Sequence, residues 1–256
     1  MKPKISVVTI TYNAATVLQP TLDSVLQQSY PYVEHLIIDG ASTDETLTMA
    51  EQYREESVET AAAHEVVIAS EPDHGIYDAM NKGLQRATGD FVVFLNAGDT
   101  LPSTDTLELV ADKAADGVGV LYGDTDIVDG EGRLLHRRRL TPPEHLSWRS
   151  FRQGMLVCHQ AFYARTNIAR QLPYDLRFRF SADVDWCIRV MKEVERQGLA
   201  FVNLHAVVAN YLEEGATTKN HKASLRERYL VMQCHYGVVQ TLLMHCWFFV
   251  RAFIRR

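Results

Sequence analysis

Apolar runs and amphipathic helical patterns alternate along the first 60 residues of the chain. Residues 5–12 (ISVVTITY) are almost continuously apolar and rich in β-branched side chains, which is typical of a strand buried on both faces. Apolar positions then recur at helical spacing over residues 16–28. A second strand is predicted over residues 34–38 and a second helix over about residues 44–56. This order predicts an α/β fold with a mostly parallel central sheet flanked by helices.

The next segment repeats the helix and strand pattern and ends on polar residues. A helix is predicted over residues 76–87 and an apolar strand over residues 91–95, which stops at Asn96-Ala97-Gly98-Asp99. In open α/β sheets, ligands bind where the strands end. Carboxylate, amide and glycine together suit a metal ion or a diphosphate. The pattern therefore predicts a ligand site at this strand end.

Polar residues also close the first two predicted strands. Thr11, Tyr12 and Asn13 end the first, and Asp39 ends the second. A carboxylate at this place can accept hydrogen bonds from a nucleobase or a ribose. The alternative is an aspartate that only caps the following helix. The motifs GxGxxG and GxxxxGK[ST] are both absent, so neither common phosphate-binding loop explains the unit.

Two further carboxylates stand in the first turn of a helix that is predicted to begin at Ser181 or Ala182. Acidic residues in a first turn are favoured by the helix dipole, so Asp183 and Asp185 can both be structural. Asp185 precedes Arg189 by four residues, which is the spacing of an ion pair on a helix surface. Asp183 is therefore the better candidate for a general base.

Composition and charge exclude several classes of protein. The chain has 256 residues, 46% of them apolar and 23% charged, as expected for one globular domain with at most a small appendage. A net charge of −6 argues against a nucleic-acid partner. The four cysteines lack zinc-binding spacing, and free thiols are typical of a reducing cytoplasm. We expect neither a signal peptide nor a membrane-spanning segment.

The C-terminal tail, residues 237–256, predicts an amphipathic helix. Its apolar residues fall mainly on one helical side, and Arg251, Arg255 and Arg256 cluster at its end. Such a helix can lie in a membrane interface with its arginines near anionic head groups, which predicts peripheral membrane contact. The alternative is a helix that packs on the domain or across a homodimer.

Four sequence blocks resemble those of a known enzyme family. ISVVTITYNAATVLQPTLDSVLQQSYPYVEHLIIDGASTDET and EPDHGIYDAMNKGLQRATGDFVVFLNAGD resemble the first blocks of family 2 glycosyltransferases, which have the GT-A fold. CHQAFYAR and FSADVDWCIR resemble the acceptor-side blocks of a bacterial branch associated with capsule, exopolysaccharide and O-antigen assembly. The likeness implies a GT-A domain over residues 1–236, with a nucleotide-sugar half in 1–100 and an acceptor half in 101–220.

The resemblance also implies roles for individual residues. Asp183 matches the aspartate of the family's Glu-Asp motif, the general base, although Ala182 replaces the preceding glutamate. Residues 215–221 match a loop that can close over the donor. The residues implied to face the donor sugar or the acceptor are His159, Gln160 and Asp185. The residues implied to bind the nucleotide are Thr11, Tyr12, Asn13, Asp39, Asp73, Lys82, Asn96 and Ala97.

The implied metal site departs from the family pattern. Members usually carry Asp-x-Asp, whereas this chain has Asn96 and Gly98 at those positions, followed by Asp99. One carboxylate and one amide make a weaker site for a hard cation than two carboxylates. We expect Mn²⁺ or Mg²⁺ with Asp99 as the main protein ligand, and metal-independent stabilisation of the leaving group is the alternative.

The resemblance implies an inverting transfer of a sugar from a nucleoside-diphosphate sugar to a hydroxyl of a growing, lipid-linked bacterial oligosaccharide. UDP is the commonest donor nucleotide of the family. The expected place is the cytoplasm, peripheral to the inner face of the cytoplasmic membrane. A nucleotide-sugar-binding subunit without turnover is the alternative. A sugar nucleotidyltransferase or a dehydrogenase is disfavoured, because TYNAATVL is neither glycine-rich nor basic.

Overall fold

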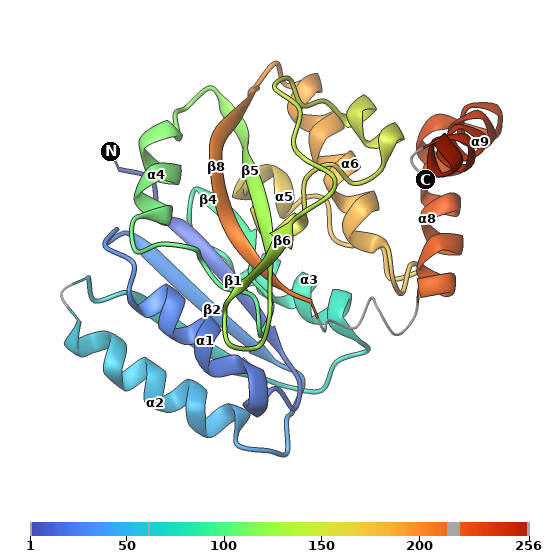
Figure 1. Cartoon of the computed structure of the whole chain (residues 1–256). Coiled ribbons are helices and arrows are strands. Elements are labelled where there is room, and N and C mark those ends of the chain that lie inside the picture. The colour runs from blue at the N-terminus through green and yellow to red at the C-terminus, as the bar shows by residue number, and fades with distance from the viewer. Residues whose placement is uncertain (1, 61, 214–220, 255–256) are drawn as a thin grey trace.

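The computed structural model describes residues 2–60, 62–213 and 221–254. Within them, eight strands form one sheet in the order β3-β2-β1-β4-β7-β5-β6, with β8 paired to β5 (Figure 1). The strands are β1 (Ile5–Thr11), β2 (Val33–Asp39), β3 (Glu65–Ser70), β4 (Phe91–Phe94), β5 (Val118–Val128), β6 (Leu134–Arg137), β7 (Phe162–Arg165) and β8 (Ala200–Leu212).

Helices cover both faces of this sheet (Figure 1). The α-helices are α1 (Ala15–Leu26), α2 (Thr46–Glu59), α3 (Ile76–Arg86), α4 (Thr106–Lys113), α5 (Thr166–Ala169), α6 (Ala182–Arg196), α8 (His221–Tyr236) and α9 (Val238–Ile254). Two 3₁₀ helices are η1 (Trp148–Gln153) and η2 (His159–Ala161).

The N-terminal half of the sheet is parallel. β1 pairs in parallel with both β2 and β4, and β2 pairs in parallel with β3. Every residue of β1 and β2 is buried, because α1 and α2 pack on one face of the sheet and α3 on the other. The approach of α3 is close at Gly83, where a Cβ atom would lie 2.4 Å from Cγ1 of Val8. Parallel pairing brings the carboxyl ends of these strands to one edge, where ligands bind in such folds.

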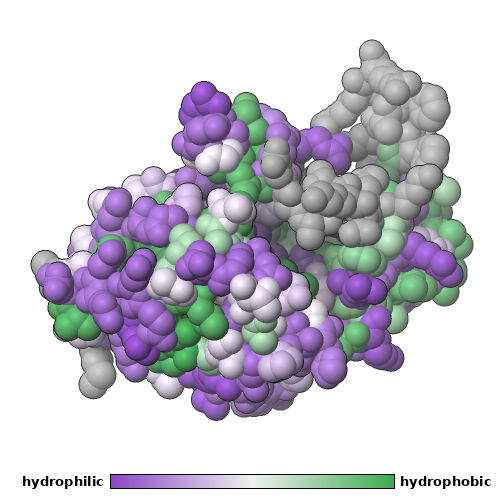
Figure 2. All heavy atoms as spheres, turned by 90° about the horizontal axis from the view of Figure 1, so that it is seen from below, coloured by the Kyte–Doolittle hydropathy of each residue, from purple (hydrophilic) through white to green (hydrophobic). Residues whose placement is uncertain are grey.

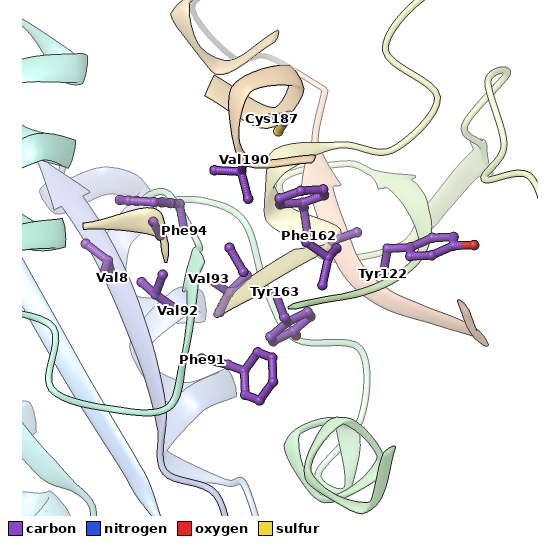
Figure 3. Packing of buried hydrophobic residues seen from close by; sticks show 14 of the residues in the cluster. Val8, Phe91, Val92, Val93, Phe94, Tyr122, Phe162, Tyr163, Cys187 and Val190 are labelled. Carbon is purple, nitrogen blue, oxygen red and sulfur yellow. The ribbon is translucent and has the colours of Figure 1, made fainter. Parts of the chain in front are cut away.

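β7 joins the parallel half to the rest of the sheet. It runs antiparallel to both β4 and β5, with Val92 opposite Ala164. In Figure 3, Phe162 points toward Cys187 and Val190 of α6, whereas Tyr163 points to the other face beside Phe91. Because β7 runs against β4, the η2 segment that precedes β7 lies beside the residues that follow β4. Two parts of the chain separated by about 60 residues therefore meet at the ligand edge.

The sequence predictions for the fold are largely confirmed. The α/β class, the mostly parallel order of the first strands and the helix after residue 75 all agree with the structure. The predictions missed β3. This strand lies at the edge of the sheet and is only partly buried, so its sequence EVVIAS lacks the long apolar run of a central strand.

The predicted C-terminal helix is present as α9. It contacts α8 and η1, and Thr241 is buried at this contact. Val239 and Leu243 are 72% and 66% exposed, so a second side of the helix is apolar and uncovered. Figure 2 shows apolar side chains on the side of the molecule where Figure 1 has α8 and α9. No helix in the described part of the chain combines the length and the hydropathy needed to cross a membrane.

Candidate active site

The carboxylate of Asp39 holds the ends of the first three strands together. It is fully buried and accepts hydrogen bonds from Thr11 Oγ1 (3.1 Å), the backbone N–H and hydroxyl of Ser42 (2.9 Å for the N–H), and Ser70 Oγ (2.7 Å). A carboxylate has about four lone-pair sites, so the protein itself satisfies this group. A nucleobase that binds Asp39 has to replace one of the hydroxyl donors.

Tyr12 and Asp73 lie against the backbone next to Asp39. A Cβ atom at Gly40 would lie 2.3 Å from Oδ2 of Asp73 and 3.3 Å from the ring of Tyr12. The Tyr12 side chain is 66% exposed. Asp73 accepts a hydrogen bond from Gly75 N–H through Oδ1 (2.8 Å). The structure therefore places an exposed aromatic ring and a second carboxylate against Gly40, the residue after Asp39, and an exposed ring can stack on a nucleobase.

Two other residues of the predicted nucleotide site support the neighbouring loops. Asn13, in a left-handed backbone conformation with φ 48°, accepts a hydrogen bond from Thr43 N–H (2.9 Å). Lys82 donates to the carbonyl of Pro72 (2.6 Å), and the carboxylates of Glu71 and Asp78 lie 3.9 and 3.8 Å from its ammonium. The carboxylates of Glu71 and Asp78 thus already balance the charge of Lys82. The hydrogen bond from Lys82 to Pro72 positions the loop that carries Asp73.

The turn after β4 contains the predicted diphosphate and metal residues. Asp99 is 4% exposed, and its two carboxylate oxygens accept hydrogen bonds from Gln160 Nε2 (2.8 Å) and Leu212 N–H (3.1 Å). Burial raises the pKa of Asp99 to about 6, even though these hydrogen bonds and the charge of His159 act in the opposite direction. The Ala97 side chain packs on the apolar cluster between α1, α2 and β2.

We expect Asp99 to make stability depend on pH. Its folded pKa of about 6 exceeds its ordinary value of 3.8, so its contribution is complete below 3.8 and is lost as pH rises through 6. In the variant Asp99→Asn this contribution does not change with pH, because an amide does not titrate, and the amide oxygen still accepts a hydrogen bond from Leu212 N–H. Between about pH 4.5 and pH 7, the free energy of unfolding of the wild type should fall by about 2 kcal/mol relative to the variant. Denaturant titrations in EDTA measure this difference, and parallel pH profiles would contradict it.

Asp183, the predicted base, lies in a group of side chains from four elements. Its carboxylate accepts a hydrogen bond from Tyr77 Oη of α3 (3.1 Å) and lies 3.5 Å from Nδ1 of His159 in η2. The other ring nitrogen of His159 lies 3.2 Å from Nδ2 of Asn96, directly after β4. The structure thus joins Asn96, His159 and Asp183, which are far apart in the sequence.

The surroundings of Asp183 keep it ionised. Burial alone raises the pKa of Asp183, but the hydrogen bond and charge of His159 and the charge of Arg228 outweigh burial and lower it below its ordinary range. Burial and the nearby Asp183 charge raise the pKa of Tyr77, so its hydroxyl remains a donor. Asp183 is therefore an ionised carboxylate at neutral pH, as a general base must be.

Asp185 does not join this group. Two residues along a helix correspond to a rotation of about 200° around its axis, so Asp185 faces away from Asp183. Arg189 Nε (2.7 Å) and His235 Nε2 (2.8 Å) contact its two oxygens. The predicted ion pair with Arg189 is confirmed. The structure gives Asp185 partners in α6 and α8 and leaves its predicted contact with a sugar without support.

For three residues that contribute to this site in the structure, the sequence predicted a different role or no role. Gln160, expected at the sugar, instead supports Asp99. Tyr77 and Arg228 were not singled out, although Tyr77 lies inside the recognised block EPDHGIYDAMNKG. The helix pattern around Arg228 contains no signal of its own. The predicted loop over residues 215–221 falls almost wholly outside the described residues.

The donor set around Asn96 does not fit a metal ion held mainly by protein carboxylates. Within the described ranges no group of three or more His, Cys, Asp or Glu side chains is arranged to hold an ion. Gly98 has no side chain, and both oxygens of Asp99 already accept hydrogen bonds. The remaining oxygen is Oδ1 of Asn96, which is buried and has no partner among these residues. One amide oxygen is a weak site for Mn²⁺ or Mg²⁺.

Comparison with known proteins identifies the family. The model of the family described as "Glycosyl transferase family 2" matches residues 6–174. The chain belongs to glycosyltransferase family 2. A relative from Mycobacterium bovis, named a PGL/p-HBAD biosynthesis glycosyltransferase, is 34% identical over 215 residues, which are 83% of this chain and 78% of the relative.

Solved structures agree with this assignment at the level of the fold. S. aureus TarS 1–349 in complex with UDP-GlcNAc superimposes with a TM-score of 0.70 and 20% identity, over 90% of this chain and 65% of that one. Glucosyl-3-phosphoglycerate synthase from Mycobacterium tuberculosis, in complex with Mn²⁺ and UDP, gives 0.61 and 18%, over 92% and 81%. The expected GT-A fold is confirmed, and the chain is a glycosyltransferase.

Proposed function

We propose that this glycosyltransferase moves a sugar from a nucleoside-diphosphate sugar to a hydroxyl group with inversion at the anomeric carbon, and that Asp183 is the general base. The observation that carries the proposal is the ionised carboxylate of Asp183, which is fixed by Tyr77 and His159 beside the end of β4. Tyr12 and Asp73, which are proposed to bind the nucleobase, lie against Gly40 at the same edge of the sheet.

In the proposed reaction, Asp183 accepts the proton of the acceptor hydroxyl while the hydroxyl oxygen bonds to the anomeric carbon. The bond from that carbon to the diphosphate oxygen breaks, and the nucleoside diphosphate leaves with the electron pair. The Tyr77 hydroxyl, 3.1 Å from Oδ1, orients the carboxylate and remains protonated. A single displacement from one face gives inversion. The expected Mn²⁺ or Mg²⁺ is given no step, because the residues near Asn96 do not fit it.

The nucleotide and the acceptor are proposed from the relatives. TarS carries UDP-GlcNAc and the mycobacterial synthase carries UDP in their solved structures, which supports a UDP-sugar donor. The resemblance to a bacterial surface-polysaccharide branch, together with a bacterial relative named for PGL/p-HBAD biosynthesis, supports an acceptor of the surface-polysaccharide kind. We accordingly propose a lipid-linked acceptor, used at the cytoplasmic face of the membrane.

Replacing Asp183 tests the proposed base. The variant Asp183→Asn retains the shape of the side chain but cannot accept the proton, so transfer should fall by a factor of about 10²–10⁴. Nucleotide affinity should change little, because the nucleobase surface lies on other elements. Release of the nucleoside diphosphate in the presence of acceptor and calorimetric binding measure the two effects.

The matched control is Asp185→Asn on the same helix. It loses contacts to Arg189 and His235, so it should lower the melting temperature while the folded protein retains turnover within about threefold. Transfer at the wild-type rate by Asp183→Asn would exclude Asp183 as the base. Binding without turnover in the wild type, with acceptor supplied, would favour the non-catalytic subunit.

The exposed apolar side of α9 supports membrane contact. We expect Val239→Asp combined with Leu243→Asp to reduce binding to anionic vesicles at least about tenfold, because both side chains are exposed and would insert among the lipids. Val58→Asp is the control, since Val58 is equally exposed but lies on α2. Vesicle sedimentation measures the effect. Unchanged vesicle binding, with a loss of self-association in analytical ultracentrifugation, would instead assign α9 to a homodimer.

A further inference from the structure

Helix α8 is attached to the segment that leads into Asp183. The carboxylate of Glu227 accepts hydrogen bonds from the backbone N–H groups of Arg179 (3.0 Å) and Phe180 (2.6 Å). Ser181 Oγ donates to the carbonyl of Ser224 (3.2 Å). These three contacts hold one face of α8 within a few residues of the candidate base, and α8 lies next to α6 in Figure 1.

Arg228 lies on that face, and its Nε has no hydrogen-bond partner among the described residues. It follows Ser224 by four residues, so the two side chains share one side of the helix. Its Nε is buried, and no hydrogen bond or carboxylate within 4 Å accompanies it in the part of the chain that the structure describes. A buried guanidinium N–H without an acceptor costs free energy, which favours an external acceptor at this place. The charge of Arg228 reaches Asp183 and lowers the pKa of that carboxyl.

A second unpartnered polar atom borders the same pair of residues. Oδ1 of Asn96 is buried and free of hydrogen bonds to the described residues, while its Nδ2 faces Nε2 of His159 at 3.2 Å. Rotating this amide by 180° would exchange its two atoms. Oδ1 would then accept a hydrogen bond from His159, and the N–H bonds of Nδ2 would occupy the place where Oδ1 now lacks a partner. On the side away from His159, the Asn96 amide would then present only hydrogen-bond donors to a ligand.

The end of β4 carries fewer carboxylates than the usual family motif does. The two carboxylates of Asp-x-Asp are replaced by Asn96 and Gly98, and each oxygen of Asp99 accepts one hydrogen bond from the protein. Around the ionised Asp183, the site contains the amide of Asn96, the imidazole of His159 and the guanidinium of Arg228. A guanidinium matches the geometry of phosphate oxygens and can bind two of them at once.

We propose that Arg228 binds the diphosphate of the donor and stabilises its growing negative charge as it leaves, so that nucleoside-diphosphate binding does not require a divalent ion. Donors placed where charge develops are a major source of catalysis. Asn96 would supply a neutral donor to the same phosphates. This inference rests on the proposed function, because it assigns a residue to the leaving group of that reaction.

The test compares affinities for a nucleoside diphosphate and the matching monophosphate in EDTA. Wild-type protein, Arg228→Gln, Arg228→Lys and the control Arg226→Gln are titrated calorimetrically with UDP and UMP. Arg226 is an exposed residue of the same helix. The ratio of the two affinities reports on contacts to the second phosphate, and a general loosening of the nucleobase site would not change it.

We expect the wild type to bind UDP in EDTA, and Arg228→Gln to lower the ratio of UDP to UMP affinity about tenfold or more. Arg228→Lys should give an intermediate ratio, and Arg226→Gln an unchanged one. An unchanged ratio in both Arg228 variants, or UDP binding by the wild type only with Mn²⁺ or Mg²⁺, would overturn the inference. A wild type that binds neither nucleotide under any condition would instead contradict the proposed function.

Discussion

The buried carboxylate of Asp99 determines how the candidate site is assembled. Its hydrogen bonds from Gln160 and Leu212 join the turn after β4 to η2 and to the end of β8. Since His159 precedes Gln160, the same contact sets the position of the histidine between Asn96 and Asp183. A residue that the sequence suggests as a metal ligand thus acts in the structure as the junction of three segments.

This use of Asp99 changes how negative charge can be stabilised at the site. Asp99 is buried and already accepts two hydrogen bonds from the protein, and the neighbouring positions contain Asn96 and Gly98 in place of carboxylates, which makes a weak site for a hard cation. Among the described residues of this site, the buried polar atoms without a hydrogen-bond partner are Oδ1 of Asn96 and Nε of Arg228. The guanidinium attracts a phosphate, and the amide does so once it is turned to place Nδ2 where Oδ1 now lies. The departure from Asp-x-Asp and the unpartnered Arg228 are therefore two parts of one electrostatic arrangement.

Local patterns in the sequence predicted those features that depend on local rules. The buried strands and the polar residues at their ends follow from continuous apolar runs, and the pair of Asp185 with Arg189 follows from a spacing of four. The contacts of Asp183 with Tyr77 and of Asn96 with His159 join residues 106 and 63 positions apart. These contacts exist because β7 is inserted antiparallel beside β4 and because α6 lies against α3, so no local pattern could reveal them.

The most direct measurement of the central claim is a thermal-shift series with UDP, GDP, dTDP, CDP and their common sugars, with and without Mn²⁺. A ligand that binds only the native state raises its stability by an amount set by its concentration relative to its dissociation constant. The account predicts that one nucleoside diphosphate and its sugar raise the melting temperature, and that they also do so without metal. No shift with any nucleotide would contradict a donor site at the carboxyl ends of β1, β2 and β4.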